Sequence, residues 1–102
     1  MDNTEQELFV GRLGVNPKLK YTKDQKPVCF LSVAINKNED EKAIWKKVVV
    51  WEKQAEQCNL YLKKGSRLFV QGRIENKEYL TKDGNTKTYE EVRASLIGFL
   101  TL

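Results

Sequence analysis

Residues 45–51, WKKVVVW, contain both tryptophans of the chain, with two lysines and three valines between them. Three consecutive β-branched residues predict a strand, because such side chains fit a pleated sheet and are restricted in a helix. Side chains alternate between the faces of a strand, so Trp45, Lys47 and Trp51 share one face. A buried core would not include Lys47, and a solvated surface would not normally carry two tryptophans. We therefore interpret this face as a binding surface that combines aromatic stacking with contact to an anion.

The sequence gives no positive sign of enzymatic or metal chemistry. It contains no histidine, which removes the commonest general base and the usual zinc ligand sets. The carboxylates at 39–41 lie in a charged stretch that is typical of a solvated loop. Gly11 and Gly14 lack the spacing and the lysine of a phosphate-binding P-loop. We expect no enzymatic activity, no cofactor and no bound metal.

The composition predicts one small folded domain. Of the 102 residues, 40% are hydrophobic and 31% are charged, without a long block of one sign, and the net charge is +4. Such a chain can bury one core, and its mild basicity is compatible with an anionic partner. We expect one domain over residues 1–102, with residues 1–6 flexible. There is no secretory signal, and no apolar run approaches the roughly 18 residues of a membrane span.

The two cysteines, Cys29 and Cys58, form no CxxC pair. We interpret them as two buried, reduced thiols that act as small apolar side chains. Reduced thiols predict a reducing compartment, either the cytoplasm or the matrix of an organelle.

One segment has the period of a helix. Within residues 52–64, Ala55, Cys58 and Leu62 fall at i, i+3 and i+7, so they share one face. Lysines in the last turn complement the helix dipole, and Gly65 is the expected cap. The other patterned segments predict five strands, at residues 8–12, 28–35, 44–51, 67–74 and 88–96.

Five strands with one helix between the third and the fourth predict an all-β OB-fold, a small Greek-key barrel. A long hairpin around Asp83–Gly84 would join the fourth and fifth strands, and polar turns are expected at residues 21–27 and 36–42. Closure of the sheet would remove most of its exposed edges. The side chains expected to face the core include Val48, Val50, Leu68, Val70, Ile74, Val92, Ala94 and Leu96.

The opposite faces of the predicted strands carry interleaved aromatic and basic side chains. Unpaired bases stack on aromatic rings, at about 1–3 kcal/mol per base, and lysine and arginine attract the phosphates between them. The pattern therefore favours single-stranded nucleic acid, and nothing in it distinguishes DNA from RNA. The alternative is that the aromatics, Phe69 above all, cover a subunit interface or a second core. The outward residues are Trp45, Lys47, Trp51, Phe69, Arg73 and Arg93.

Four segments resemble the bacterial-type single-stranded DNA-binding protein family, SSB. They are VGRLGVNPKLKYT at 10–22, WKKVVVWEKQAE at 45–56, YLKKGSRLFVQGRI at 61–74 and YEEVRASLIGFL at 89–100. The resemblance runs in order over nearly the whole chain. It implies an OB-fold that assembles into a homotetramer, with a dimer as the alternative, and that binds and protects single-stranded DNA in replication, recombination or repair. A cytoplasmic, nucleoid-associated location is implied as well.

The resemblance also implies roles for individual residues. Trp45 and Trp51 correspond to base-stacking positions of the family, and Tyr79 on the long hairpin corresponds to another. Tyr61 is interpreted as a packing residue. The residues at or near basic positions of the family's DNA path are Lys20, Lys47, Lys53, Lys64 and Lys77.

The sequence departs from the family pattern at two places. The loop after Asn36 is short and has no aromatic residue, where many members have a further stacking tryptophan. Members usually continue into a linker and an acidic tail that recruits replication and repair proteins, whereas this sequence ends at Leu102, so no tail-dependent partner is predicted. Two alternatives stay open: a tail-less relative that acts in replication restart, like the primosomal PriB proteins, and an OB-fold used as a protein-interaction module.

Overall fold

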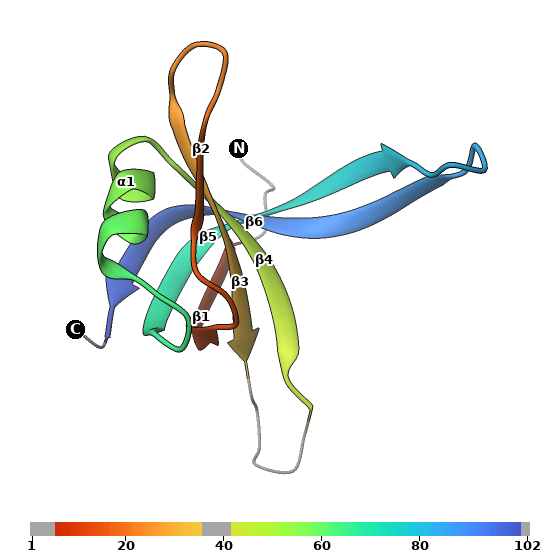
Figure 1. The fold of residues 1–102 in the computed structure, drawn as a ribbon. Coiled ribbons are helices and arrows are strands. Elements are labelled where there is room, and N and C mark those ends of the chain that lie inside the picture. Colours follow the sequence, from red (N-terminus) through yellow and green to blue (C-terminus); the bar gives the residue numbers. More distant parts are fainter. Residues whose placement is uncertain (1–5, 36–41, 101–102) are drawn as a thin grey trace.

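The computed structural model describes residues 6–35 and 42–100, which form a closed barrel with one helix and a projecting hairpin (Figure 1). The elements are β1 (Gln6–Leu13), β2 (Lys18–Tyr21), β3 (Pro27–Ile35), β4 (Ile44–Trp51), α1 (Glu52–Tyr61), β5 (Arg67–Leu80) and β6 (Thr86–Phe99). Five strands close in the order β1-β3-β4-β6-β5 and back to β1, and only β4 and β6 pair in parallel. This ring, with α1 between β4 and β5, confirms the predicted OB-fold.

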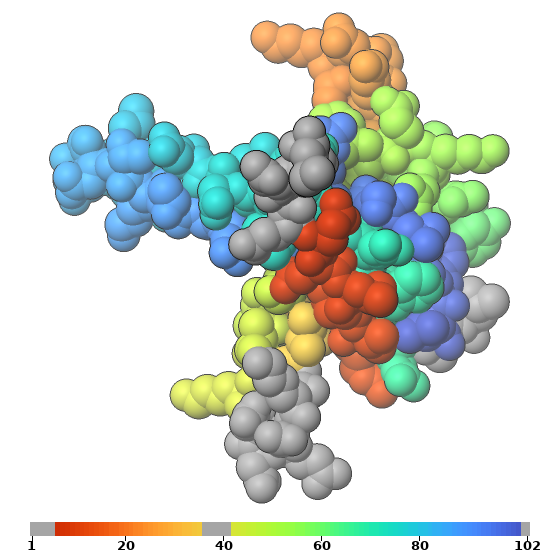
Figure 2. Space-filling view, turned by 180° about the vertical axis from the view of Figure 1, so that it is seen from behind, coloured from red at the N-terminus to blue at the C-terminus, as the bar shows by residue number. Residues whose placement is uncertain are grey.

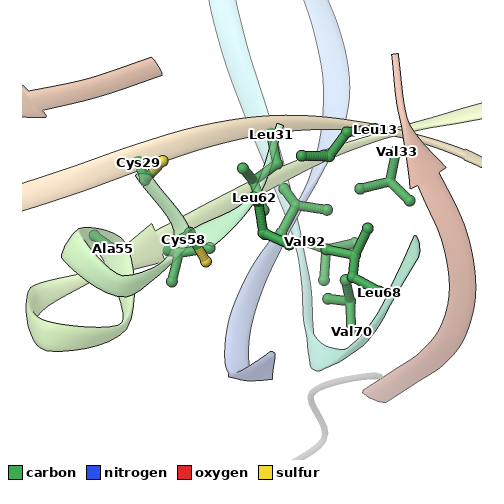
Figure 3. Packing of buried hydrophobic residues seen from close by; sticks show 12 residues of the cluster. Leu13, Cys29, Leu31, Val33, Ala55, Cys58, Leu62, Leu68, Val70 and Val92 are labelled. Carbon is green, nitrogen blue, oxygen red and sulfur yellow. The ribbon is translucent and has the colours of Figure 1, made fainter. Parts of the chain in front are cut away.

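The barrel interior is filled by aliphatic side chains that alternate along the strands (Figure 3). Ala55, Cys58 and Leu62 lie at or just beyond the buried face of α1 and join the same cluster, as their spacing predicted. Among the described residues no polar or charged side chain is buried. Each buried valine or leucine contributes about 1.5–3 kcal/mol relative to an exposed position. The predicted core residues of the strands that are buried are Val48, Val50, Leu68, Val70 and Val92, and Ile74 and Ala94 pack against them.

A short strand, β2, was not predicted. It pairs with β3 beyond the point where β1 pairs with β3, so β1 and β2 share one edge of that strand. Its sequence, KLKY, offers a single inward apolar residue, Leu19, which packs against the core. A single inward apolar residue produces no alternation of apolar and polar residues. The sequence pattern therefore did not predict a strand here. The predicted turn follows at once, with Thr22 N–H donating to the carbonyl of Lys26 over 2.9 Å.

The expectation that Leu96 faces the core is wrong, because β6 contains a bulge. Gln71 pairs with Leu96, whereas the next residue of β5, Gly72, pairs with Ala94. Ser95 is therefore an extra residue in β6, and an extra residue reverses the face of every side chain that follows it.

The helix holds this bulge in place. The Gln54 amide donates to the Ser95 carbonyl over 3.0 Å, and its oxygen accepts from the Ile97 N–H over 3.1 Å. Beyond the bulge Ile97 and Phe99 pack against the core, and Leu96 is left 47% exposed on the outer side.

The helix ends earlier than its sequence period suggested. It stops at Tyr61, because Leu62 adopts an extended backbone that places its side chain in the core. Gly65 is therefore not the cap of the helix. It occupies the turn before β5 with a φ of +90°, and its N–H donates to the carbonyl of Leu13 over 2.8 Å. In the described part of the chain, no helix has the length and apolar character needed to cross a membrane.

The β5–β6 hairpin extends well beyond the barrel (Figure 1). Its tip is the predicted Asp83–Gly84 turn, with Gly84 at a φ of +86°. The hydroxyl of Thr81 donates to Asp83 and holds the pKa of that exposed carboxyl below its usual value. The predicted loop at 36–42 lies, except for its last residue, outside the described residues.

Candidate nucleic-acid interface

Aromatic and basic side chains gather on the outer side of β4 and its neighbours, opposite Val48 and Val50, and Val49 is buried among them on the outer side. Register places the outward residues of β2, β3, β4 and the adjoining part of β6 on this one side of the sheet. Three cation–ring contacts and one ring–glycine contact hold most of these side chains in place. We call this surface the cationic–aromatic face; it consists of Lys18, Lys20, Phe30, Trp45, Lys47, Trp51, Tyr89 and Arg93.

Trp45 lies at one end of the face and is 59% exposed. Its six-membered ring packs on Gly14, so closely that a methyl group on that glycine would overlap the ring. The contact is made by the outer edge of the ring, and the side chain as a whole remains largely open to a ligand. This is the arrangement that a stacking platform requires.

Lys47 connects the outer side of β4 to the projecting hairpin. Its ammonium lies 4.5 Å from the ring centroid of Tyr89, and the ring of Tyr89 lies 5.9 Å from that of Tyr79. Tyr89 pairs with Lys77 across the hairpin, which puts it on the same side as Tyr79. The structure thus brings three aromatic or basic side chains into one row. The role of Tyr89 was not predicted, because its position depends on a strand register that one sequence does not reveal.

Trp51 is half-buried at the other end of β4, and the guanidinium of Arg93 lies 5.8 Å from its ring. On the neighbouring strands, Lys20 lies 5.9 Å from the ring of Phe30. Phe30 was not predicted either, although a signal was present: it alternates with the buried residues Cys29 and Leu31 and must therefore point outward.

The remaining predicted basic residues are dispersed. Lys77 lies on the hairpin with its ammonium 3.3 Å from a carboxylate oxygen of Glu75. Arg73 lies opposite Arg93 across β5 and β6. Lys53 is exposed in the first turn of α1, and Lys64 follows the helix; neither belongs to the cationic–aromatic face as defined.

Phe69 is placed apart from the predicted group. Its cross-strand neighbours are Val10 on β1 and Gly98 on β6, and its ring packs on that glycine. Leu8 and Leu96 lie on the same outer side, with exposed fractions of 68% and 47%. We call these residues, Leu8, Val10, Phe69 and Leu96, the apolar outer face. Figure 2 shows β1 on the molecular surface beside β5 and β6.

The charge of the cationic–aromatic face is predominantly positive. A hollow of about 180 Å³ between β2, β3 and β4 is lined by Lys18, Phe30, Lys47 and one carboxylate, Glu91, among others. Among the described residues no group of three or more cysteine, aspartate or glutamate side chains could hold a metal ion. The face can therefore offer flat rings and cations, the two features that a single-stranded nucleic acid needs.

Comparison with known proteins also points to binding of single-stranded nucleic acid. The sequence model of the single-strand binding protein family matches residues 5–100. The chain therefore belongs to the single-strand binding protein family.

Three relatives illustrate the extent of the similarity. A protein of Neisseria meningitidis named single-stranded DNA-binding protein is 33% identical over 95 residues, which cover 86% of this chain and 55% of the relative. One of the same name from Bacillus cereus is 36% identical over 98 residues, covering 91% and 58%. Single-stranded DNA-binding protein 2 of Clostridium acetobutylicum is 35% identical over 98 residues, covering 91% and 74%. The chain thus spans just over half the length of the first two relatives.

Proposed function

We propose that this chain binds single-stranded DNA with little sequence preference and protects it during replication, recombination or repair. The observation that carries the proposal is the row on the outer side of β4, where Trp45 and Trp51 flank Lys47 and each ring is held by a neighbouring group. Every base has a face that can stack on an indole, and every nucleotide has a phosphate that can contact a cation. Such contacts do not read base edges, so binding is sequence-tolerant. Membership of the family and the names of the relatives support the same ligand.

The decisive experiment is a titration of the intrinsic tryptophan fluorescence with oligo-dT. Stacking of a base on Trp45 or Trp51 quenches emission, and double-stranded DNA of equal length serves as the control. A parallel titration with oligo-U measures the preference between DNA and RNA, which no group on the face distinguishes. If the emission stays unchanged as oligo-dT is added up to a large excess over the protein, the proposal fails. The alternative of a protein-interaction module is then favoured.

Two substitutions locate the binding surface. Trp45→Ala and Trp51→Ala should each weaken binding by about 1–3 kcal/mol. Trp45 is largely exposed, so its loss should leave the melting temperature nearly unchanged, whereas the half-buried Trp51 contributes to stability as well. Lys47→Ala should weaken binding equally for all base compositions. Tyr61→Leu, on α1, is the control that should leave binding unchanged.

We further propose that the chain forms a homo-oligomer, with a homotetramer as the leading arrangement. The apolar outer face supports self-association, because three of its side chains, Leu8, Val10 and Leu96, are exposed on one side of the sheet around Gln71 in the described part of the chain. The adjacent part of β1 supports it too: residues 6–10 pair with β5 on one side and have no strand partner on the other among the described residues. An unpaired strand edge is a site for pairing with a second copy.

Light scattering measures the mass directly. We expect a mass of two or four chains for the wild type, and a monomer for Val10→Glu, which places a charge in the centre of the apolar outer face. Leu60→Glu, at an exposed apolar position of α1, introduces the same single charge and should leave the mass unaltered. A wild-type monomer would contradict the oligomer proposal but not single-strand binding.

A further inference from the structure

Two arginines lie directly opposite each other on the outer side of the sheet. Arg73 of β5 is in register with Arg93 of β6, so both guanidinium groups leave the sheet on the same side. Like charges directly opposite across two strands destabilise a sheet, unless an anion lies between them. Among the described residues the ion pairs are Lys46–Glu7 and Lys77–Glu75, and neither arginine takes part in one.

Carboxylates lie near the pair without forming an ion pair with it. Glu75 and Glu91 are the next opposed pair on the same side of the ladder, beyond Ile74 and Val92, and neither forms an ion pair with an arginine. Asp24 and Glu52 line a hollow together with Arg93, again without an ion pair. Among the described residues these carboxylates lower the local charge, but the donors of the two arginines are not engaged in an ion pair.

A separate hollow lies next to the arginine pair. It measures about 380 Å³ and is lined by Gln6, Arg73, Arg93, Ala94 and Ser95, with no carboxylate among these residues. Guanidinium groups donate through a planar fork that matches a phosphate, and two of them can contact one phosphate from both sides. The site therefore has the charge, the donors and the space for a phosphate group.

We propose that Arg73 and Arg93 together bind a backbone phosphate of single-stranded DNA, at the nucleotide next to the base that stacks on Trp51. The connection to that base is direct, since Arg93 lies 5.8 Å from the Trp51 ring. A bound phosphate removes the repulsion between the two arginines. The pair therefore stabilises the complex with DNA and destabilises the free protein. The inference rests on the proposed single-strand binding and specifies one of its contacts.

The salt dependence of oligo-dT binding tests the pair. Each phosphate contact to a single strand contributes about 0.7 to the slope of log K against log salt concentration. Arg73→Gln and Arg93→Gln should each lower the slope by about this amount and weaken binding about tenfold at low salt. Arg93→Lys keeps the charge and should keep the slope. Circular dichroism confirms that each variant is folded at the titration temperature.

The chain offers a comparison in a second arginine pair. Arg12 and Arg67 lie opposite each other across β1 and β5, and Arg12 is in register with Ala34, the cross-strand neighbour of Trp45. Neither of them lines the hollow beside Ser95, so Arg67→Gln should lower the slope for oligo-dT less than Arg73→Gln does. The masses of all variants are compared first, so that a change in assembly is not mistaken for a change in binding.

Thermal melting without DNA provides a second readout. Because the opposed charges repel, Arg73→Gln should raise the melting temperature by about 1–5 °C at low salt. The gain should vanish at high salt, where repulsion is screened. A side chain with a merely structural role would give a lower melting temperature instead.

Three outcomes overturn the proposal. One is a wild-type slope for both glutamine variants while oligo-dT still quenches the wild type; single-strand binding then stands and the phosphate pair does not. Another is a lower melting temperature for both variants, which assigns the arginines to stability. The last concerns the melting temperature of the wild type in the presence of inorganic phosphate. If inorganic phosphate raises it as much as oligo-dT at an equal concentration of phosphate groups, the arginines form a site for free anions. Absence of any oligo-dT binding by the wild type would instead contradict the proposed function itself.

Discussion

The outer edge of the six-membered ring of Trp45 abuts Gly14, the residue that follows β1. The φ of this glycine is not in the left-handed region, so its backbone could accommodate any residue. What excludes a side chain is the indole itself. The glycine therefore leaves room for the edge of an exposed indole, and this contact fixes the position of a ring that can receive a base.

We predict that Gly14→Ala weakens oligo-dT binding by about 1 kcal/mol, because the new methyl group displaces a stacking ring that contributes about 1–3 kcal/mol. The domain should remain folded, since the exposed indole can move into solvent. The measurement is the emission of Trp45 in a Trp51→Phe background, where acrylamide should quench the displaced ring more strongly. Leu60→Ala, at an exposed position of α1, should change neither quantity. Unaltered quenching in Gly14→Ala would mean that the glycine does not hold the ring.

Most of the barrel could be predicted from the sequence because its strands are rich in β-branched and apolar residues. Val48, Val50 and Val92 are buried as their alternation predicted, and so are Ala55 and Cys58, three residues apart in α1. The exposed side of Leu96 could not be predicted, because a bulge leaves no mark in an alternating sequence until the partner strand is known. Gln54, which holds that bulge, reads in the sequence as an ordinary exposed helix residue.

The candidate site could be predicted only where its residues share one strand. Trp45, Lys47 and Trp51 are two, four and six residues apart, so strand geometry alone puts them on one side. Tyr89 reaches them through the register of β5, β6 and β4, which is a long-range property. Phe69 has the right chemistry, but its register with β1 places it in the apolar outer face.

Tyr89 should contribute to binding together with Lys47. Because the ammonium lies 4.5 Å from the ring, the two side chains stabilise each other and present one surface to a nucleotide. Tyr89→Leu should weaken oligo-dT binding by about 1–2 kcal/mol. In the double variant with Lys47→Ala, the loss should be smaller than the sum of the single losses, as expected for residues in contact. Strictly additive losses would show that the two side chains act independently.

The junction between β4 and α1 stores backbone strain. Glu52 has a φ of +62°, in the left-handed region that only glycine adopts without a penalty. Glu52→Gly should therefore raise the free energy of unfolding by about 1 kcal/mol, measured by chemical denaturation. Glu52→Ala retains the Cβ and should give no such gain. If both variants are equally stable, the strain is not relieved by glycine, and the Glu52 side chain itself determines the stability of this junction.

The two buried thiols predict a loss of stability at alkaline pH. Burial raises the pKa of Cys29 to about 11 and that of Cys58 to about 12, whereas an unfolded thiol titrates near 8.5. Between about pH 8.5 and the folded values the unfolded chain releases protons that the folded chain retains, so the free energy of unfolding falls as the pH rises. The slope approaches about 1.4 kcal/mol per pH unit for each thiol.

Chemical denaturation at about pH 7.5, 9 and 10 measures this slope. Below about pH 8.5 both states keep their thiol protons, and the thiols should add no pH dependence there. A variant with Cys29→Ala and Cys58→Ala should be less stable at neutral pH, because two core contacts are lost, yet its stability should decline less between pH 9 and pH 10 than that of the wild type. Lysine and tyrosine titration is common to both proteins and cancels in the comparison. Equal declines in the two proteins would show that the thiols titrate alike in the folded and unfolded chains, contrary to their burial.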